Sequence, residues 1–330
     1  MNVLITGTTG FVGGHLLRHL SEKPGLRLIA TGRSARLQPE SASRAAMYVS
    51  ADLSNGCPPI SADVCIHAAG LADDRSPASE LYRHNVDATR NLLESLQDCR
   101  RFIFISSGSV YGVQREPLRE SDATADSALS AYGRSKWNAE QVVREVCSRR
   151  GIAYAILRPR AIYGIGDRVL FPRLVRLMRP PFLLTIGQGL APVSLTYVGH
   201  LATLVETLVL AERPAENGVF NVADAETYRI RDVLASLHEA IHGRQPRILR
   251  IPGALLRTYI AVCELLGRTG ALSRQSLTYL TEPCVLDCTA ARNALGYAPD
   301  TTFTNHVEAI ARGQRETLPR ILVPNQENER

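Results

Sequence analysis

The chain has 330 residues, of which 45% are hydrophobic and 21% are charged, and its formal net charge at pH 7 is +6. This composition is typical of a soluble globular protein, and the length allows more than one lobe around a core. Its arginines are scattered along the sequence, which argues against a nucleic-acid-binding protein. The sequence has no apolar run of the ~18 residues that a membrane-spanning helix needs, so we expect no integral membrane span.

The seven cysteines are an odd number, and none is spaced with a histidine in a zinc-binding pattern. We therefore expect reduced cysteines in a cytoplasmic protein, and no bound metal. We also expect no signal peptide, because the first predicted strand begins at Asn2.

Short apolar runs alternate with helical patterns through the first half of the chain. The expected strands are residues 3–5, 26–31, 48–49, 64–67, 102–106 and 153–157. The expected helices are residues 10–20, with Phe11, Leu16, Leu17 and Leu20 facing inward, and residues 85–97 and 131–146. Parallel neighbours in a sheet need a crossover helix, so this alternation predicts an α/β fold with a doubly wound parallel sheet. Ligands of such a sheet bind at the carboxyl ends of its strands.

Prolines break the second half of the chain into shorter pieces. Residues 171–178, 199–210, 230–242 and 252–266 are predicted helices, and residues 219–222 a returning strand. We expect a dinucleotide-binding domain over residues 1–160 and a smaller substrate lobe over residues 161–318, with segments that return to the sheet. Residues 319–330 form a polar tail, for which we expect disorder.

Three glycines spaced by three residues, Gly7, Gly10 and Gly13, stand between the first strand and the first helix. The first permits a tight turn, the second lets backbone approach a pyrophosphate, and the third allows close helix–strand packing. The N-terminus of the helix offers amide donors and a positive dipole to the phosphates. A glycine turn without a ligand is the alternative, but the strand-to-helix position favours a dinucleotide.

The second strand ends in Thr31, Gly32, Arg33 and Ser34, without the carboxylate that usually contacts the ribose of NAD. An arginine suits the 2′-phosphate of NADP, because a planar guanidinium can bind a phosphate through two hydrogen bonds. We therefore expect NADP(H) to be preferred, with NAD(H) possible.

Two further strand ends belong to the expected cofactor site. Asp52 and Leu53 follow the third strand, where an adenine would lie, although a cap of a helix or turn is an equal alternative for Asp52. The fourth strand ends in small residues that let a cofactor approach the backbone, namely Ala68, Ala69 and Gly70.

A Tyr-x-x-x-Lys element, Tyr132 to Lys136, opens the predicted helix 131–146 and follows the serine-rich end of the fifth strand. A spacing of four places both side chains on one helix face, one turn apart. The ammonium would favour the phenolate and lower the pKa of the tyrosine from its ordinary value of about 10. The alternative is a surface pair without a role, but the glycine turn and the serines favour proton transfer beside a dinucleotide.

Together these motifs resemble the extended short-chain dehydrogenase/reductases, the NAD-dependent epimerase/dehydratase superfamily. The resemblance covers about residues 1–315 and includes residues 85–92. It implies a Rossmann domain with a substrate lobe, and a catalytic set of Ser107, Tyr132 and Lys136. The motifs and the resemblance predict a cofactor-binding set of Gly7, Thr9, Gly10, Phe11, Val12, Arg33, Asp52, Leu53, Ala68, Ala69, Gly70, Asn85, Tyr132, Lys136 and Pro159.

The resemblance also implies a mechanism, which is reversible hydride transfer between a nicotinamide and a carbonyl or alcohol carbon. In reduction, Tyr132 would protonate the developing alkoxide while Ser107 donates a hydrogen bond to it. Lys136 would hold the nicotinamide ribose and tune Tyr132. Asn85 resembles a position that supports the active-site helix and a water, with a helix cap as the alternative. The resemblance further suggests a homodimer through a helix bundle.

Departures from the family pattern bear on the substrate. Gly108 and Ser109 stand where 4,6-dehydratases carry an Asp-Glu pair. Ala161 replaces an asparagine of nucleotide-sugar epimerases, and residues 193–195 replace their Arg-Asp-Phe. A bound diphosphate needs donors or cations in place of water, so these losses argue against a sugar nucleotide. Arg160 or Arg173 could substitute.

Residues 157–167, 195–198 and 290–299 instead resemble the 3β-hydroxysteroid dehydrogenase-like branch, which includes 2-alkyl-3-oxoalkanoate reductases. This resemblance implies an apolar or amphipathic substrate. The apolar residues 252–266 fit a lid over such a substrate or a contact with a membrane surface. The charges of Arg257 and Glu264 favour a third interpretation, a helix packed on the lobe.

We therefore expect an NAD(P)-dependent oxidoreductase that interconverts a hydroxyl and a keto group on an apolar or amphipathic small molecule. The second hypothesis is a nucleotide-sugar 4-epimerase or 4-ketoreductase that uses the same Tyr132. A dinucleotide-sensing protein without turnover is the third, and the presence of both Tyr132 and Lys136 argues against it.

Overall fold

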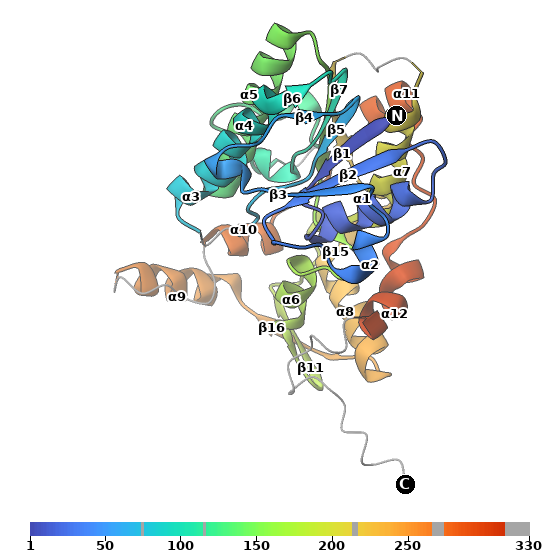
Figure 1. Ribbon diagram of the computed structural model, residues 1–330. Coiled ribbons are helices and arrows are strands. Elements are labelled where there is room, and N and C mark those ends of the chain that lie inside the picture. The colour runs from blue at the N-terminus through green and yellow to red at the C-terminus, as the bar shows by residue number, and fades with distance from the viewer. Residues whose placement is uncertain (74–75, 115–116, 213–216, 266–273, 314–330) are drawn as a thin grey trace.

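The computed structural model describes residues 1–73, 76–114, 117–212, 217–265 and 274–313. Within these residues a parallel sheet of seven strands runs in the order β14-β8-β7-β5-β1-β2-β3 (Figure 1). This confirms the predicted α/β class with a doubly wound parallel sheet. The strands are β1 (Asn2–Thr6), β2 (Arg27–Gly32), β3 (Met47–Ser50), β5 (Val64–His67), β7 (Arg101–Ile105), β8 (Ala153–Pro159) and β14 (Gly218–Val222).

Helices cover both faces of the sheet because its strands are apolar on both sides. In β1, Val3 and Ile5 enter one core while Leu4 enters the other, as the alternation of side chains along a strand requires. The first core is covered by α1 (Phe11–Ser21), α7 (Val198–Leu210) and α11 (Thr289–Leu295). The second is covered by α4 (Ala88–Ser95) and α5 (Ala131–Arg150).

The second half of the chain contributes directly to this sheet. Strand β14 pairs with β8 from Gly218 opposite Ala155 to Val222 opposite Pro159. Helices α7 and α11 also come from the second half and pack against the first core. The carboxyl ends of β8 and β14 therefore lie side by side.

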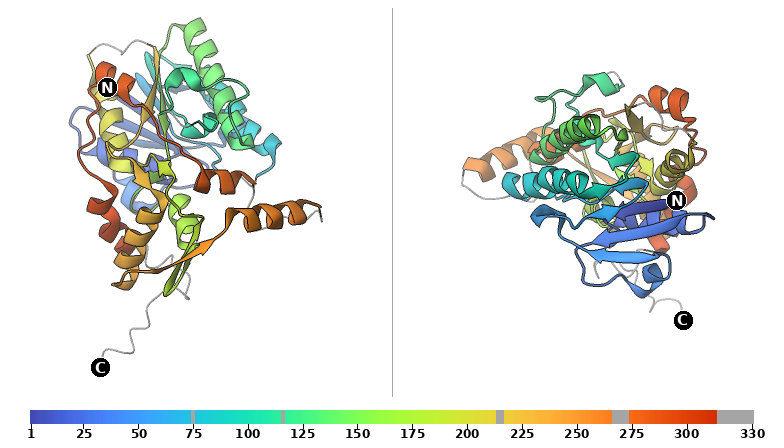
Figure 2. Two further views of the ribbon diagram at one scale, coloured as in Figure 1. Left: turned by 180° about the vertical axis from the view of Figure 1, so that it is seen from behind. Right: turned by 45° about the horizontal axis from the view of Figure 1, so that its top comes forward.

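A smaller lobe lies below the carboxyl ends of the strands in Figure 1. Its core joins α6 (Leu170–Val175), α8 (Ile230–His242) and α12 (Phe303–Gly313) to a small sheet of β10 (Met178–Arg179), β11 (Phe182–Ile186) and β16 (Arg247–Ile251). Helix α9 (Gly253–Leu265) follows β16 and projects away from the molecule, as Figures 1 and 2 both show. It precedes α10 (Arg274–Thr281).

Short elements complete the described structure. They are α2 (Pro39–Ala42), η1 (Leu53–Asn55), β4 (Ile60–Ser61), α3 (Ala78–Tyr82), η2 (Arg83–Asp87), β6 (Leu96–Gln97), η3 (Gly108–Val110), η4 (Glu120–Asp122), β9 (Ile162–Tyr163), β12 (Pro192–Val193), β13 (Thr196–Tyr197) and β15 (Tyr228–Arg229). None of the described helices is both long and apolar enough to cross a membrane.

Some predicted elements were wrong in part. The helix expected over residues 171–178 ends at Val175, and Met178 pairs with Leu183 in β10 and β11 instead. Pro180 and Pro181 follow, and the residue before a proline is disfavoured in a helix. The helix expected over residues 85–97 contains a π-helical turn, η2, and ends at Ser95.

The inward position expected for Phe11 was also wrong, because this ring is only partly buried and contacts the ring of His15. Leu16, Leu17 and Leu20 are fully buried, as expected. The predicted polar tail, residues 319–330, lies outside the described residues.

Candidate active site

The turn from β1 to α1 packs tightly against the end of β5. Gly7 has a φ of +70°, and a β-carbon there would lie 2.9 Å from the α-carbon of Ala69, so only glycine fits. A β-carbon at Gly13 would overlap the carbonyl oxygen of Gly7, which lets α1 start close to the turn. Gly10 caps α1 without a side chain that could occupy the first amide groups of the helix. This cradle suits a pyrophosphate at the N-terminus of α1.

Arg33 and Asp52 lie close together at the ends of β2 and β3. Burial alone would raise the pKa of Asp52, but hydrogen bonds from Ser54 and the charges of His84 and Arg33 outweigh it and hold that pKa below its ordinary value. The carboxylate accepts the Ser54 N–H at 3.1 Å and caps η1, so the capping role is realised. The Leu53 side chain is buried in the core, so a cofactor could reach only its backbone.

The segment that ends β5 is fixed by a buried threonine. The N–H groups of Ala68 and Ala69 donate to Thr6 Oγ1 at 3.1 Å and 3.0 Å. The same oxygen lies 2.8 Å from His67 Nδ1, and His67 Nε2 lies 3.0 Å from Thr89 Oγ1. Burial, and to a smaller extent the charge of Lys136, lowers the pKa of His67 to about 3, so the imidazole stays neutral near pH 7.

Asn85 connects the end of β5 to helix α5. Its Oδ1 accepts the Leu71 N–H at 2.7 Å, and its Nδ2 donates to Ser135 Oγ at 2.8 Å. The residue lies inside η2, so the alternative of a helix cap was wrong. A β-carbon at Gly70 would lie 2.9 Å from Asn85 Oδ1, which shows how closely this loop approaches the carboxamide. π-helical turns of this kind are frequent at functional sites.

The first turn of α5 presses against the segment that follows β7. Ser107 Oγ accepts the Ser109 N–H at 3.1 Å and opens η3. Ser130 caps α5, because its Oγ accepts the Gly133 N–H at 2.7 Å. A β-carbon at Gly133 would overlap the carbonyl oxygen of Ser109. This contact brings the half-buried Tyr132 to the junction of α5 with the Ser107 segment.

Lys136 lies one turn further along α5 and is buried. Its Nζ donates to the Ile105 carbonyl at 2.7 Å and lies 4.2 Å from the centre of the Phe104 ring. Burial lowers the pKa of Lys136 to about 7, although the charge of Glu140 acts in the opposite direction. The ammonium is therefore held at the end of β7.

A buried ion pair behind Lys136 was not predicted. Glu140 and Arg158 are 0% and 1% exposed, and Arg158 donates to the two carboxylate oxygens at 2.9 Å and 2.6 Å. Ser106 Oγ donates to the same carboxylate at 2.5 Å, and Tyr111 Oη accepts from Arg158 at 2.9 Å. The sequence offered one sign that Glu140 lies near the candidate site. Its spacing of four from Lys136 places both residues on one face of the helix.

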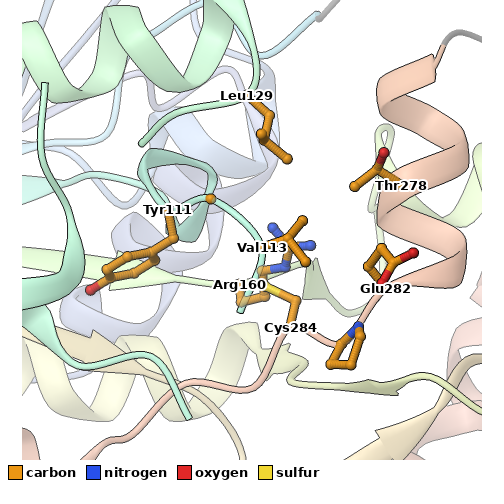
Figure 3. Close-up of a pocket in the computed structure, with 9 residues that line it drawn as sticks. Tyr111, Val113, Leu129, Arg160, Thr278, Glu282 and Cys284 are labelled. Carbon is orange, nitrogen blue, oxygen red and sulfur yellow. The ribbon is translucent and has the colours of Figure 1, made fainter. Parts of the chain in front are cut away.

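A small pocket that is open to solvent lies beside the Ser107 segment. Figure 3 shows Thr278 and Glu282 on one side of it and Val113 and Leu129 on the other. Arg160 lines the pocket between them, and its Cδ would lie 3.2 Å from a β-carbon at Gly108. The other lining residues are Tyr111, Gly112, Pro283 and Cys284.

The expected residues thus follow several neighbouring strands. Because the sheet is parallel, the segments after β1, β2, β3, β5, β7 and β8 share one edge, where ligands of such sheets bind. Ser107, Tyr132 and Lys136 gather near the end of β7, while Arg33 and Asp52 lie at the ends of β2 and β3. Pro159 is the buried last residue of β8, next to Arg160 of the pocket.

Comparison with known proteins adds three findings. The model of the NAD dependent epimerase/dehydratase family matches residues 3–223. The chain is 27% identical to the 4-hydroxy-2-methyl-3-oxo-4-farnesyl-3,4-dihydroquinoline-1-oxide ketoreductase of Stigmatella aurantiaca, over 94% of this chain and 96% of that protein. It is 26% identical to the N-acetyl-alpha-D-glucosaminyl-diphospho-ditrans,octacis-undecaprenol 4-epimerase of Escherichia coli O157:H7, over 91% of each chain.

A solved structure is similar along nearly the whole chain. It is the UDP-glucuronic acid 4-epimerase of Bacillus cereus in complex with NAD, with a TM-score of 0.75 and 21% identity. The alignment covers 98% of this chain and 100% of that one. At this identity the likeness shows a shared fold.

Proposed function

The chain belongs to the NAD dependent epimerase/dehydratase family, and we propose that it is an NAD(P)-dependent oxidoreductase that interconverts a hydroxyl and a keto group on an apolar or amphipathic small molecule. One observation carries this proposal. The close contact of Gly133 with Ser109 brings the first turn of α5, with Tyr132, against the Ser107 segment, and buried Lys136 follows one turn later.

The residues present fit a nicotinamide dinucleotide. The cradle of Gly7, Gly10 and Gly13 would receive the pyrophosphate, and the segment from Ala68 to Gly70 would border the cofactor. When bound, the nicotinamide supplies or accepts the hydride. The protein's own contribution is to orient the reacting groups and to move a proton.

In the reductive direction, the Tyr132 hydroxyl would give its proton to the developing alkoxide. Ser107 Oγ would donate a hydrogen bond to the same oxygen, and a placed donor of this kind contributes about 3 kcal/mol where charge develops. The positive charge of Lys136 would favour the phenolate that remains on Tyr132. Proton transfer of this kind typically accelerates a reaction by about 10² to 10⁴.

The pocket supports a substrate with an apolar part. Val113, Leu129 and Pro283 give it apolar walls, while Arg160 and Glu282 add polar groups. The ketoreductase relative is named for a farnesylated quinoline and the epimerase relative for an undecaprenol-linked sugar. Both names contain a polyprenyl chain, so we propose a substrate that joins a polar keto or hydroxy group to an apolar tail.

We propose NADP(H) as the preferred cofactor, with NAD(H) as the alternative. Arg33 is exposed at the end of β2, where a guanidinium could bind the 2′-phosphate. A cytoplasmic location and a homodimer through a helix bundle belong to the same proposal, and light scattering tests the second.

The alternative function is a 4-epimerase or 4-ketoreductase that acts on a sugar nucleotide or a related diphosphate. The epimerase relative favours it, as does Arg160 in the pocket, since a guanidinium can bind a diphosphate. Ala161 argues against it, because alanine offers no side-chain donor to the sugar.

Oxidation of NADPH and NADH against a panel of ketones tests the proposal. The panel contains β-keto acids of increasing chain length, steroid ketones and UDP-keto-sugars. The variant Tyr132→Phe, assayed in parallel, gives the oxidation that does not depend on the tyrosine. We expect turnover with apolar ketones, and kcat/KM that rises with chain length. Turnover restricted to UDP-keto-sugars, together with calorimetric binding of UDP, would establish the alternative, and a protein that binds neither dinucleotide would contradict both.

A further inference from the structure

Helix α9 exposes an apolar stripe. Leu255, Tyr259, Val262 and Leu265 are 64%, 48%, 48% and 86% exposed. Their spacings of four, three and three residues place them along one side of the helix. The opposite side of α9 is already packed, because Ile260 is buried in a small core with its neighbours. Single exposed apolar residues are ordinary, but a continuous stripe marks an interaction surface.

The strand that leads into α9 carries further exposed apolar side chains, which point to both sides of its small sheet. In β16, Ile248 and Leu249 are 41% and 50% exposed. Phe182 of the neighbouring strand β11 is 41% exposed and stands opposite Arg247 in the sheet register. We define the α9 face as the exposed apolar residues Leu255, Tyr259, Val262 and Leu265.

The chain around the α9 face is strongly basic. Residues 168–187 and 243–263 contain no aspartate or glutamate, and Glu264 is the one acidic residue of α9. All their charged residues are exposed arginines, namely Arg168, Arg173, Arg176, Arg179, Arg244, Arg247, Arg250 and Arg257. Arginines and exposed apolar side chains therefore occur in the same two segments, which β11 and β16 join into one sheet, and Glu264 lies at the end of α9.

We propose that the α9 face docks on the surface of an anionic lipid bilayer. A helix with an apolar stripe and nearby arginines inserts its apolar side at the boundary between headgroups and acyl chains, while the guanidinium groups contact lipid phosphates. Helix α9 has 13 residues, far fewer than the ~20 that span a bilayer, so the contact is with one surface only.

A second copy of this chain fits the α9 face less well. In a symmetric dimer the same patch is present on both subunits, so the arginines of one copy would face those of the other. Like charges brought together in an interface oppose association. An anionic bilayer presents the opposite charge to these arginines.

Docking has a consequence for the pocket. Helix α10 follows α9 in the chain, and the pocket in Figure 3 is lined by Thr278 of α10 and by Glu282, which directly follows this helix. This consequence rests on the proposed function: a substrate with an apolar tail would approach the pocket from the membrane, beside α10. The docking itself requires neither cofactor nor turnover.

Co-sedimentation of the full chain with lipid vesicles tests the docking. The probes are vesicles of phosphatidylcholine alone and vesicles of phosphatidylcholine mixed with phosphatidylglycerol. We expect binding to the mixed vesicles, weaker binding as the salt concentration rises, and little binding to phosphatidylcholine alone.

Two variants with matched controls identify the surface. The triple variant Leu255→Ser, Tyr259→Ser and Val262→Ser should lose vesicle binding, whereas Leu210→Ser, at an exposed leucine on α7, should retain it. The double variant Arg247→Glu and Arg250→Glu should bind anionic vesicles about tenfold more weakly or worse, whereas Arg18→Glu on α1 should bind as the unchanged protein does. Circular dichroism verifies that each variant is folded.

Failure of the unchanged protein to sediment with anionic vesicles would overturn the proposal. Equal binding by the folded triple variant would do the same. Light scattering compares the oligomeric state of the unchanged protein with that of the triple variant. If the unchanged protein is an oligomer, the variant is a monomer and neither binds vesicles, the α9 face is a subunit interface and the proposal is wrong. Because the assay measures no turnover, these outcomes are independent of the proposed oxidoreductase activity.

Discussion

The α-carbon of Gly133 packs directly on the carbonyl oxygen of Ser109, so that a β-carbon at this position would overlap the oxygen. Glycine inside a helix costs about 1 kcal/mol relative to alanine, so its presence in the first turn of α5 requires a reason. The reason here is the close approach of two segments, one with Tyr132 and the other with Ser107. The geometry of the candidate catalytic set depends on this missing side chain.

Replacing Gly133 by alanine should separate these two segments. The variant should lose about 1–3 kcal/mol of unfolding free energy, as overpacked sites do. Its kcat/KM should fall by about 10²-fold, since a displacement of about 1 Å at a catalytic group has that effect. Urea denaturation and steady-state kinetics measure the two losses. Asn138→Ala, at an exposed position of the same helix, is the control, and unchanged activity in Gly133→Ala would contradict the role of the contact.

Lys136 should make the stability of the cofactor-free protein depend on pH. Its pKa is about 7 in the folded protein against an ordinary value of 10.5, so the unfolded chain binds the proton more tightly. Between these two values the unfolded state carries more protons, and stability rises with pH. Below about pH 7 both states are protonated, and the cost of burying the charge is present in full.

The variant Lys136→Met removes this dependence and serves as the reference. The difference in unfolding free energy, unchanged protein minus Lys136→Met, should increase from pH 7 to pH 9 by up to about 1.4 kcal/mol per pH unit. Urea denaturation at several pH values measures it, and other titrating groups cancel in the difference. Parallel stability curves for the two proteins would show that Lys136 is not desolvated as the structure indicates.

The buried pair of Glu140 and Arg158 should be costly to break from one side. Glu140→Ala leaves the guanidinium buried without its carboxylate and should lower the unfolding free energy by about 3–5 kcal/mol. The double variant Glu140→Met and Arg158→Met should lose less unfolding free energy than the sum of the losses in Glu140→Met and in Arg158→Met. Glu145→Ala on the same helix as Glu140 breaks only exposed ion pairs, with Arg90 of α4 and Arg149 of α5, and should barely change the stability. Additive losses would show that the two buried residues are not coupled.

Arg33 should distinguish the two dinucleotides. A charge-assisted hydrogen bond contributes about 1.5–3 kcal/mol, so Arg33→Ala should raise the Kd of NADPH by roughly 10- to 100-fold. The Kd of NADH should change little, because NADH lacks the 2′-phosphate. Fluorescence titration of the same variant with both dinucleotides provides the comparison, and equal changes would mean that Arg33 does not contact the phosphate.

The parts of the fold that could be predicted from sequence depend on local patterns. The alternation of apolar runs and helices predicted the parallel sheet, since crossover connections are a local consequence of strand order. The glycine spacing predicted the tight turn at Gly7, where the positive φ is observed. The prolines at positions 180 and 181 could also have predicted that α6 ends early. The apolar periodicity of residues 171–178 favoured a longer helix instead.

The rest depends on contacts between distant segments. Arg158 is 18 residues from Glu140, and only the packing of α5 on β8 makes them a pair. The hydrogen bond of Asn85 to Ser135 spans 50 residues. The exposed side of α9 could not be predicted either, because the sequence of an apolar helix does not show whether another part of the chain covers it. The interpretation that it simply packs on the lobe was therefore only half right, since one side packs and the other is exposed.

The pairing of β14 with β8 means that the two halves of this chain are not interchangeable modules. A fragment that stopped at residue 160 would present β8 as an open edge, with its backbone donors and acceptors unmatched along the length of the strand. Such an edge invites aggregation, and the apolar face now covered by α7 and α11 would be bare beside it. Evolution of a new specificity in this architecture therefore has to proceed by altering loops and side chains around a shared sheet, because exchanging the whole C-terminal half would remove a strand from that sheet.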